Sequence, residues 1–274
     1  GGMNAMIVDS SALTEQVVVD VLASAFDSAG QRCSALRVLC LQDDVADHTL
    51  KMLRGAMAEC RMGNPGRLTT DIGPVIDAEA KANIENHIQA MRAKGRPVFQ
   101  AVRDNSEDAR EWRSGTFVPP TLIELASFDE LKKEVFGPVL HVVRYNRNNL
   151  NELVEQINAS GYGLTLGVHT RIDETIAQVT GSAKVGNLYV NRNMVGAVVG
   201  VQPFGGEGLS GTGPKAGGPL YLYRLLANRP ENALGVTLAR QDAEYPVDAQ
   251  LKTVLTQPLE ALIAWAEKRP ELRA

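Results

Sequence analysis

The sequence predicts an α/β fold: an open, largely parallel sheet flanked by helices, followed by a C-terminal tail segment. Short apolar stretches alternate with amphipathic helical stretches between Asn4 and Val190, an order that is typical of parallel strands connected by helices. The chain has 274 residues, of which 44% are hydrophobic, and this is enough for one sizeable core.

The expected elements can be taken in chain order. The expected strands are short and apolar, and they lie at 4–8, 35–41, 97–102, 119–124, 138–145, 165–169 and 187–190. The expected helices carry apolar residues at helical spacing, and they lie at about 11–28, 45–61, 78–94, 149–158 and 172–179.

The character of the sequence changes after Pro219. Between Gly196 and Gly218, 9 of the residues are glycines, and apolar residues stand between them, which indicates a structured loop region rather than a linker. We therefore predict one domain over 1–219 and a separate C-terminal segment over 220–274, with a helix at about 249–266.

Composition excludes several classes of partner. The net charge of -4 comes from 28 basic and 32 acidic residues spread along the chain, so we expect no nucleic-acid binding. No apolar run approaches the roughly 20 residues that cross a bilayer, so we expect no transmembrane segment. The start Gly1-Gly2 is unusual for a natural amino terminus, and we interpret the chain as a piece of a longer protein.

The three cysteines are odd in number and lack the spacing of a zinc or redox motif, which favours a reduced, cytoplasmic setting and no metal site. Cys33 lies on a connection between a helix that ends near Gly30 and an apolar strand. Backbone N–H groups at such a position stabilise a thiolate and an oxyanion, and Arg32 favours the thiolate by its charge. A buried, inert cysteine is the plain alternative.

A cysteine–histidine hydrolase is a second alternative for Cys33. The chain has four histidines, and none stands in a recognisable sequence context. They are His48, His87, His141 and His169.

Two further phrases have weak meaning alone. Glu134 precedes a tight turn and a strand in Glu134-Val135-Phe136-Gly137-Pro138, which is typical of any loop-to-strand boundary. Phe204 lies among glycines in Pro203-Phe204-Gly205-Gly206, and an aromatic ring in such a loop can form the wall of a substrate pocket.

Taken together and in order, these phrases resemble the aldehyde dehydrogenase superfamily over 1–219. The matching phrases are Gly1-Gly2-x-Asn4, the Gly-Gln-x-Cys phrase ending at Cys33, Glu134-x-Phe136-Gly137-Pro138, Asn158 with Tyr162-Gly163-Leu164, Gly186-Asn187 with Asn191, and Pro203-Phe204-Gly205-Gly206.

Within the superfamily the sequence looks closest to the L-glutamate gamma-semialdehyde (pyrroline-5-carboxylate) dehydrogenases, in the form fused within bacterial proline utilisation A proteins. The phrases that carry this likeness are the run 31–37 (QRCSALR), the run 196–206 (GAVVGVQPFGG) and the run 210–219 (SGTGPKAGGP). The tail beyond Asn228 is similar to the segment that leads out of the dehydrogenase in the longest of those proteins.

The resemblance implies a mechanism in which the Cys33 thiolate attacks the aldehyde, hydride passes to NAD, and water hydrolyses the thioester to glutamate. It implies that the backbone N–H of Cys33 and an upstream asparagine hold the oxyanion. By the same resemblance, the substrate-binding residues are Arg32, Ser34, Gly196, Ala197 and Phe204, and the residues that bind the nicotinamide ribose of NAD are Glu134 and Phe136.

The resemblance also implies partners on the parent chain: an NAD-binding half and an FAD-dependent proline dehydrogenase domain, in an oligomeric protein that is peripheral to the inner membrane. The family's general base is a glutamate directly before the Gly-Gly phrase, upstream of Gly1. We therefore expect the 274 residues to fold but not to oxidise aldehydes alone. A dehydrogenase for another aldehyde and a non-catalytic scaffold module remain alternatives.

Overall fold

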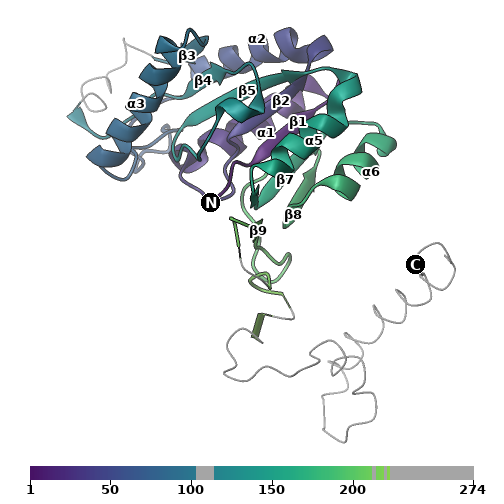
Figure 1. Cartoon of the computed structure of the whole chain (residues 1–274). Helices are drawn as coiled ribbons and strands as arrows, with labels where there is room; N and C mark the ends of the chain where they lie inside the picture. Colours follow the sequence, from purple (N-terminus) through teal and green to yellow (C-terminus); the bar gives the residue numbers. More distant parts are fainter. Residues whose placement is uncertain (103–113, 212–213, 219–220, 223–274) are drawn as a thin grey trace, which may run out of the picture. The chain divides into compact units, whose positions relative to one another are not determined.

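A computed structural model of the chain describes residues 1–102, 114–211, 214–218 and 221–222 (Figure 1). The chain divides into two units, Gly1–Arg224 and Leu225–Ala274, and the second lies outside the described residues. The helix that we expect at 249–266 lies there too, and the predicted boundary at 219 stays a prediction.

The first unit is built on a seven-stranded sheet with the strand order β3-β4-β5-β2-β1-β7-β8 (Figure 1). Neighbouring strands are parallel except for β3 and β4, which pair antiparallel at one edge. The predicted open, largely parallel sheet is therefore confirmed. Its strands are β1 (Ala5–Val8), β2 (Val38–Gln42), β3 (Val98–Gln100), β4 (Thr121–Glu124), β5 (Val139–Tyr145), β7 (Thr165–His169) and β8 (Asn187–Val190).

The central strands start level with one another. Ala5 of β1 pairs with Val38 of β2 on one side and with Leu166 of β7 on the other, and Val38 also pairs with His141 of β5. Because these strands are parallel, their amino ends meet at one edge of the sheet and their carboxyl ends at the opposite edge. We call these the amino edge and the carboxyl edge.

Helices cover both faces of the sheet, since a parallel sheet needs both faces buried. The helices α1 and α2 pack against each other, as do α5 and α6 (Figure 1). Right-handed connections place these two pairs on opposite faces, because the chain moves across the sheet in opposite directions through them. The helices are α1 (Thr14–Phe26), α2 (Asp43–Glu59), α3 (Ala78–Ala93), α5 (Leu150–Ala159) and α6 (Asp173–Ser182), and the short 3-10 turns are η1 (Asp27–Gly30), η2 (Phe128–Glu130) and η3 (Arg147–Asn149).

Several predicted boundaries differ from the observed ones by two or three residues, and two of the differences have a clear local reason. Helix α1 starts at Thr14 rather than near residue 11, because the Ser11 hydroxyl bonds the Asp9 carboxylate at 2.6 Å instead of capping the helix. Strand β2 starts at Val38 rather than at residue 35. The carbonyl of Ala35 is taken by a side chain, that of Asn4, at 2.9 Å.

The glycine-rich region is attached to the sheet by a small ribbon that the sequence did not predict. Strand β6 (Tyr162–Gly163) pairs antiparallel with β9 (Glu207–Gly208). None of the described helices is long and apolar enough to cross a membrane.

Candidate active site

The segment that carries Cys33 lies at the amino edge, between η1 and β2. Ser28, Ala29 and Gly30 have φ values of 56°, 54° and 66°, so three residues in the left-handed region turn the chain after α1. Only glycine fits at position 30, because a Cβ there would lie 2.2 Å from the carbonyl oxygen of Gly137. The turn presents Cys33 as an exposed side chain, as the sequence predicted for a connection.

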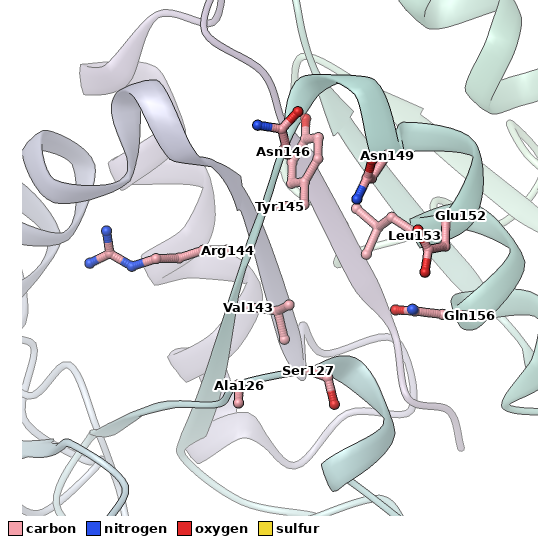
Figure 2. A pocket seen from close by; sticks show the side chains of 10 residues that line it. All are labelled: Ala126, Ser127, Val143, Arg144, Tyr145, Asn146, Asn149, Glu152, Leu153 and Gln156. Atoms are coloured by element: carbon pink, nitrogen blue, oxygen red, sulfur yellow. The ribbon is translucent and has the colours of Figure 1, made fainter.

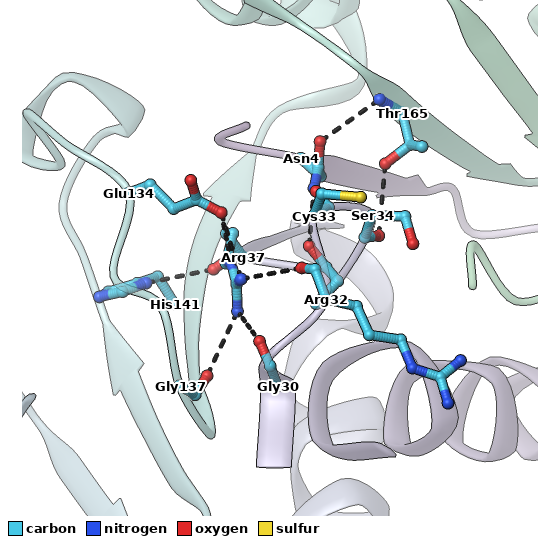
Figure 3. Close-up of polar contacts among 11 residues, drawn as sticks. Asn4, Gly30, Arg32, Cys33, Ser34, Arg37, Glu134, Gly137, His141 and Thr165 are labelled. Atoms are coloured by element: carbon cyan, nitrogen blue, oxygen red, sulfur yellow. Dashed lines mark hydrogen bonds and ion pairs between the residues drawn. The ribbon is translucent and has the colours of Figure 1, made fainter. Parts of the chain in front are cut away.

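The Asn4 side chain holds the backbone at Cys33 and directly after it (Figure 3). Its Nδ2 donates to the carbonyl oxygens of Cys33 at 2.8 Å and Ala35 at 2.9 Å. Its Oδ1 accepts from the backbone N–H of Thr165 at 3.3 Å, and the Thr165 hydroxyl donates to the carbonyl of Ser34 at 3.4 Å. The thiol is therefore carried by a backbone that two neighbouring strands fix in place.

Arg37 holds the same segment from the other side, and its side chain is fully buried (Figure 3). Its guanidinium donates to the carbonyls of Gly30 at 2.7 Å and Arg32 at 3.1 Å. It also donates to Glu134 Oε1, at 3.2 Å from Nη2 and 3.3 Å from Nε, and to the carbonyl of Gly137 at 3.3 Å. Burial lowers the pKa of Arg37, and the Glu134 carboxylate opposes that shift.

A cavity of about 330 Å³ opens at the Cys33 side chain. Phe204 lines it, and its backbone pairs with Ala216 through two hydrogen bonds of 3.0 and 2.9 Å. Asn187 fixes the flanking residues, since its side chain donates to the carbonyl of Pro203 at 2.9 Å and accepts from the N–H of Gly205 at 3.2 Å. The lining residues are Gly1, Cys33, Leu164, Phe204, Gly205, Gly206, Ser210, Gly211, Pro214, Ala216 and Tyr221.

Glu134 and Phe136 line a second cavity, of about 560 Å³, together with Gln31 from the nucleophile segment. The Phe136 ring is 46% exposed, and its centroid lies 4.9 Å from the Arg37 guanidinium carbon. The Glu134 carboxylate also approaches Gly1, where a Cβ would lie only 2.1 Å from Oε2. Gly1 lines the Cys33 cavity, so Glu134 lines the second cavity and also approaches one residue of the first.

Four predicted substrate-binding residues line neither cavity. The Arg32 Nε donates to the Ser28 hydroxyl at 3.0 Å, and Figure 3 shows its guanidinium directed away from Cys33. Ser34 is buried, Gly196 is exposed with φ 78°, and Ala197 is half-buried. Their roles therefore stay predictions.

The sequence reasoning gave no role to the side chains that support the nucleophile segment, among them Asn4 and Arg37. Asn4 stands in one of the family phrases, and Arg37 is a charge inside an apolar run that reads as a buried strand. That interruption was a usable signal, because a buried charge requires partners.

Two histidines support the backbone of Arg37, one directly and one through the other. The ring Nδ1 of buried His141 lies 3.1 Å from the Arg37 carbonyl oxygen, and its Nε2 lies 2.8 Å from Nε2 of His87. Burial lowers the pKa of His141 to about 3. Among the described residues, no histidine hydrogen-bonds Cys33, which argues against the cysteine–histidine hydrolase.

A smaller cavity of about 150 Å³ lies at the carboxyl end of β5 (Figure 2). Polar side chains such as Ser127 and Glu152 line it, and it contains none of the predicted site residues. Within the described part of the chain, no three His, Cys, Asp or Glu side chains gather as a metal site.

The chain is similar in sequence to known proteins over most or all of its length. The chain is 90% identical to the bifunctional protein PutA of Escherichia coli (strain K12) over all 274 residues, which are 21% of that protein. It is 35% identical to the 1-pyrroline-5-carboxylate dehydrogenase of Bacillus cereus (strain B4264), over 81% of this chain and 42% of the relative. The chain thus spans about a fifth of the length of the PutA relatives that it matches.

Solved structures give the same result. A crystal structure of a bifunctional proline utilization A (PutA) protein matches 81% of this chain and 22% of its own, with a TM-score of 0.76 and 54% identity. A 1-pyrroline-5-carboxylate dehydrogenase from Thermus with bound NAD matches 80% of this chain and 41% of its own, with a TM-score of 0.70 and 35% identity. The family model for the aldehyde dehydrogenase family covers residues 1–227. The chain belongs to the aldehyde dehydrogenase family, as its sequence phrases predicted.

Proposed function

We propose that this chain is the thiol-bearing part of an NAD-dependent dehydrogenase that oxidises L-glutamate gamma-semialdehyde to glutamate, the second step of proline catabolism. The observation that carries the proposal is the exposed Cys33 in a cavity, on a backbone fixed by Asn4 and by Arg37, which also binds the Glu134 carboxylate. Relatives named PutA and 1-pyrroline-5-carboxylate dehydrogenase support the choice of substrate.

The chemistry starts at the Cys33 sulfur. The thiolate adds to the aldehyde carbon and forms a C–S bond, and the carbonyl oxygen becomes an oxyanion held by the backbone N–H of Cys33. When the oxyanion collapses, hydride leaves the carbon and a thioester remains on Cys33. Water then cleaves the C–S bond, which gives the carboxylic acid and regenerates the thiol.

We assign the second cavity to the nicotinamide ribose of NAD, and the nicotinamide ring of the bound cofactor would accept the hydride. Glu134 is held by Arg37 through Oε1 alone, so Oε2 remains an acceptor for a ribose hydroxyl. The exposed Phe136 ring offers a flat apolar face beside it. A hydrogen-bond acceptor and an aromatic face suit the binding and orientation of the nicotinamide end of this cofactor.

The substrate carries a carboxylate, an ammonium group and a short aliphatic chain. We assign the carboxylate to Ser34 and to the backbone N–H groups of Gly196 and Ala197, since glycine lets donors approach an anion closely. Phe204 forms the wall for the aliphatic chain, and Arg32 adds positive charge to this end of the site.

The whole activity belongs to a parent chain of which these residues are a part. We assign to that parent an NAD-binding half, a proline dehydrogenase domain with FAD, an oligomeric state and a cytoplasmic location, peripheral to the inner membrane. The 274 residues alone are expected to give no NADH, because the general base and most of the NAD site belong to the rest of the parent.

The test is NAD reduction by the parent-length protein with glutamate semialdehyde and with simple aliphatic aldehydes. Cys33→Ala should abolish turnover, by at least about 10⁴-fold, and the matched Cys60→Ser should not. Turnover with aliphatic aldehydes alone would keep the dehydrogenase and overturn the substrate. Turnover that survives Cys33→Ala would overturn the mechanism, and no turnover at all would favour the scaffold alternative.

A further inference from the structure

We propose that Arg37 is a positioning residue, whose buried guanidinium sets the distance between the Cys33 thiol and the Glu134 carboxylate. This inference rests on the proposed function, because it concerns the relation between the nucleophile and the cofactor-binding carboxylate. In the proposed reaction, Arg37 touches neither the thiol nor the substrate.

Arg37 is a buried cation. The Arg37 side chain is 0% exposed, and a buried cation is tolerated only when its donors are paired. Its five hydrogen bonds divide between two segments that are far apart in the sequence. Two go to the carbonyls of Gly30 and Arg32, and three go to Glu134 and the carbonyl of Gly137.

The shape of the guanidinium suits these contacts. Nε and Nη2 both reach the same carboxylate oxygen, Oε1 of Glu134, while Nη1 and Nη2 reach the nucleophile segment. Only a planar guanidinium presents donors in this fixed fork, whereas the ammonium of lysine is a compact point charge. Packing alone does not explain the choice, since an apolar residue of similar volume often replaces a buried ion pair without loss of stability.

Arg37 is itself anchored by neighbouring side chains. A carbonyl only accepts, so His141 must donate Nδ1–H to the Arg37 carbonyl at 3.1 Å. The remaining His141 Nε2 is then an acceptor, and His87 on α3 donates to it at 2.8 Å. The Phe136 ring covers the guanidinium on another side. Strand β5 and helix α3 thus fix the backbone from which the fork extends.

The consequence concerns the distance across which hydride moves. The aldehyde carbon is held on Cys33, and the cofactor's ribose is held at Glu134, so an error in either position misplaces the reacting atoms. A misplacement of about 1 Å reduces rates about 100-fold. We therefore expect Arg37→Lys in the parent-length protein to lower kcat by about 100-fold and to raise the KM for NAD.

The control is Arg54→Lys. Arg54 also pairs with a glutamate, Glu124, at 2.5 Å, but it is 39% exposed and lies outside both cavities. The Arg54→Lys variant should leave kcat and the KM for NAD unchanged. The melting temperature of each variant shows whether it is folded at the assay temperature. Because kcat is then expressed per folded molecule, a loss of fold is not counted as a loss of positioning.

A second variant tests the coupling without changing Arg37. Glu134→Gln removes charge from the carboxylate, and if Arg37 links the two segments, the rate of Cys33 alkylation by iodoacetamide should change about 3-fold or more without NAD. The limiting rate at high pH is the measurement, because the thiol is then fully ionised and its pKa no longer matters.

The outcomes separate clearly. Wild-type kinetics in Arg37→Lys, or an unchanged limiting alkylation rate in Glu134→Gln, would overturn the positioning role. If the wild-type parent did not reduce NAD, the proposed function would fail, and the alkylation experiment would still decide whether Arg37 couples the segments.

Discussion

The two edges of the sheet both carry buried polar side chains, but they use them differently. At the amino edge, Asn4 and Arg37 donate to backbone carbonyls of the segment around Cys33. At the carboxyl edge, the Asp9 carboxylate bonds the hydroxyls of Ser11 and Thr170. The first network fixes the backbone that carries one exposed side chain, that of Cys33. The second network links only residues that follow the strands, and among the described residues it supports no exposed reactive group.

Each edge also has a buried histidine, and the contrast is repeated there. His141 at the amino edge engages both ring nitrogens. His169 at the carboxyl edge has Nε2 at 3.5 Å from Asp20 Oδ2, and neither atom has a hydrogen-bond partner. Buried polarity alone therefore does not mark a site. A site is marked instead by several side-chain donors that bind the backbone around one reactive residue.

The largest expected difference is in thiol reactivity. Cys33 is exposed at the amino edge, whereas Cys40 is buried within β2, where burial raises its thiol pKa to about 12. We expect native Cys33 to react with iodoacetamide at pH 7.5 at least about 1,000-fold faster than Cys40. Mass spectrometry of the labelled 274-residue chain measures both rates. In urea they should converge, and similar native rates would contradict the contrast.

The next prediction compares two asparagines. Asn4→Ala removes two donated bonds and one accepted bond at the amino edge, and we expect a loss of about 3 kcal/mol in the free energy of unfolding. It should also slow NAD reduction by the parent about 10-fold or more per folded molecule. Urea unfolding and turnover are the measurements.

The matched change at the carboxyl edge is Asn191→Gly. Asn191 bonds both backbone groups of Thr170, at 3.0 and 2.9 Å, and its φ of 51° suits glycine. The expected loss is about 1–2 kcal/mol, with turnover per folded molecule unchanged. Slower turnover in this variant would show that the carboxyl edge contributes to catalysis.

The last prediction concerns how stability depends on pH at the amino edge. The pKa of His141 is about 3 in the folded chain, below its usual 6.5, so the unfolded chain binds a proton that the folded chain does not. Stability should fall by about 2 kcal/mol from pH 7 to pH 5 through this residue. His141→Asn should remove that part of the loss in urea titrations at the two pH values. An unchanged pH dependence would mean that His141 is protonated in the fold.

Much of the fold was predictable because hydrophobic periodicity is local. All seven strands of the sheet were expected at nearly their observed places, and the Cys33 connection followed from the helix and strand around it. The ribbon of β6 and β9 was missed, since each strand has two residues and its partner is remote. The start of α1 was missed because Ser11 bonds Asp9, a contact made by the turn after β1.

The site was predictable only as a set of phrases. Cys33 and Phe204 were expected in one pocket and do share one, and Glu134 and Phe136 share another. Arg37 and His141 were not singled out, because their meaning depends on which carbonyl lies beside them. Such contacts join residues about 100 positions apart, and no local pattern specifies them.

The Arg37–Glu134 contact also carries a timing requirement during synthesis. The two residues are 97 positions apart, and a ribosome that adds about 5–20 residues per second needs roughly 5–20 s to produce the second after the first. Throughout that interval the growing chain contains Arg37 without its partner Glu134, so the contacts that fix the segment around Cys33 are incomplete. The thiol is thus synthesised before the contacts that fix its segment are complete.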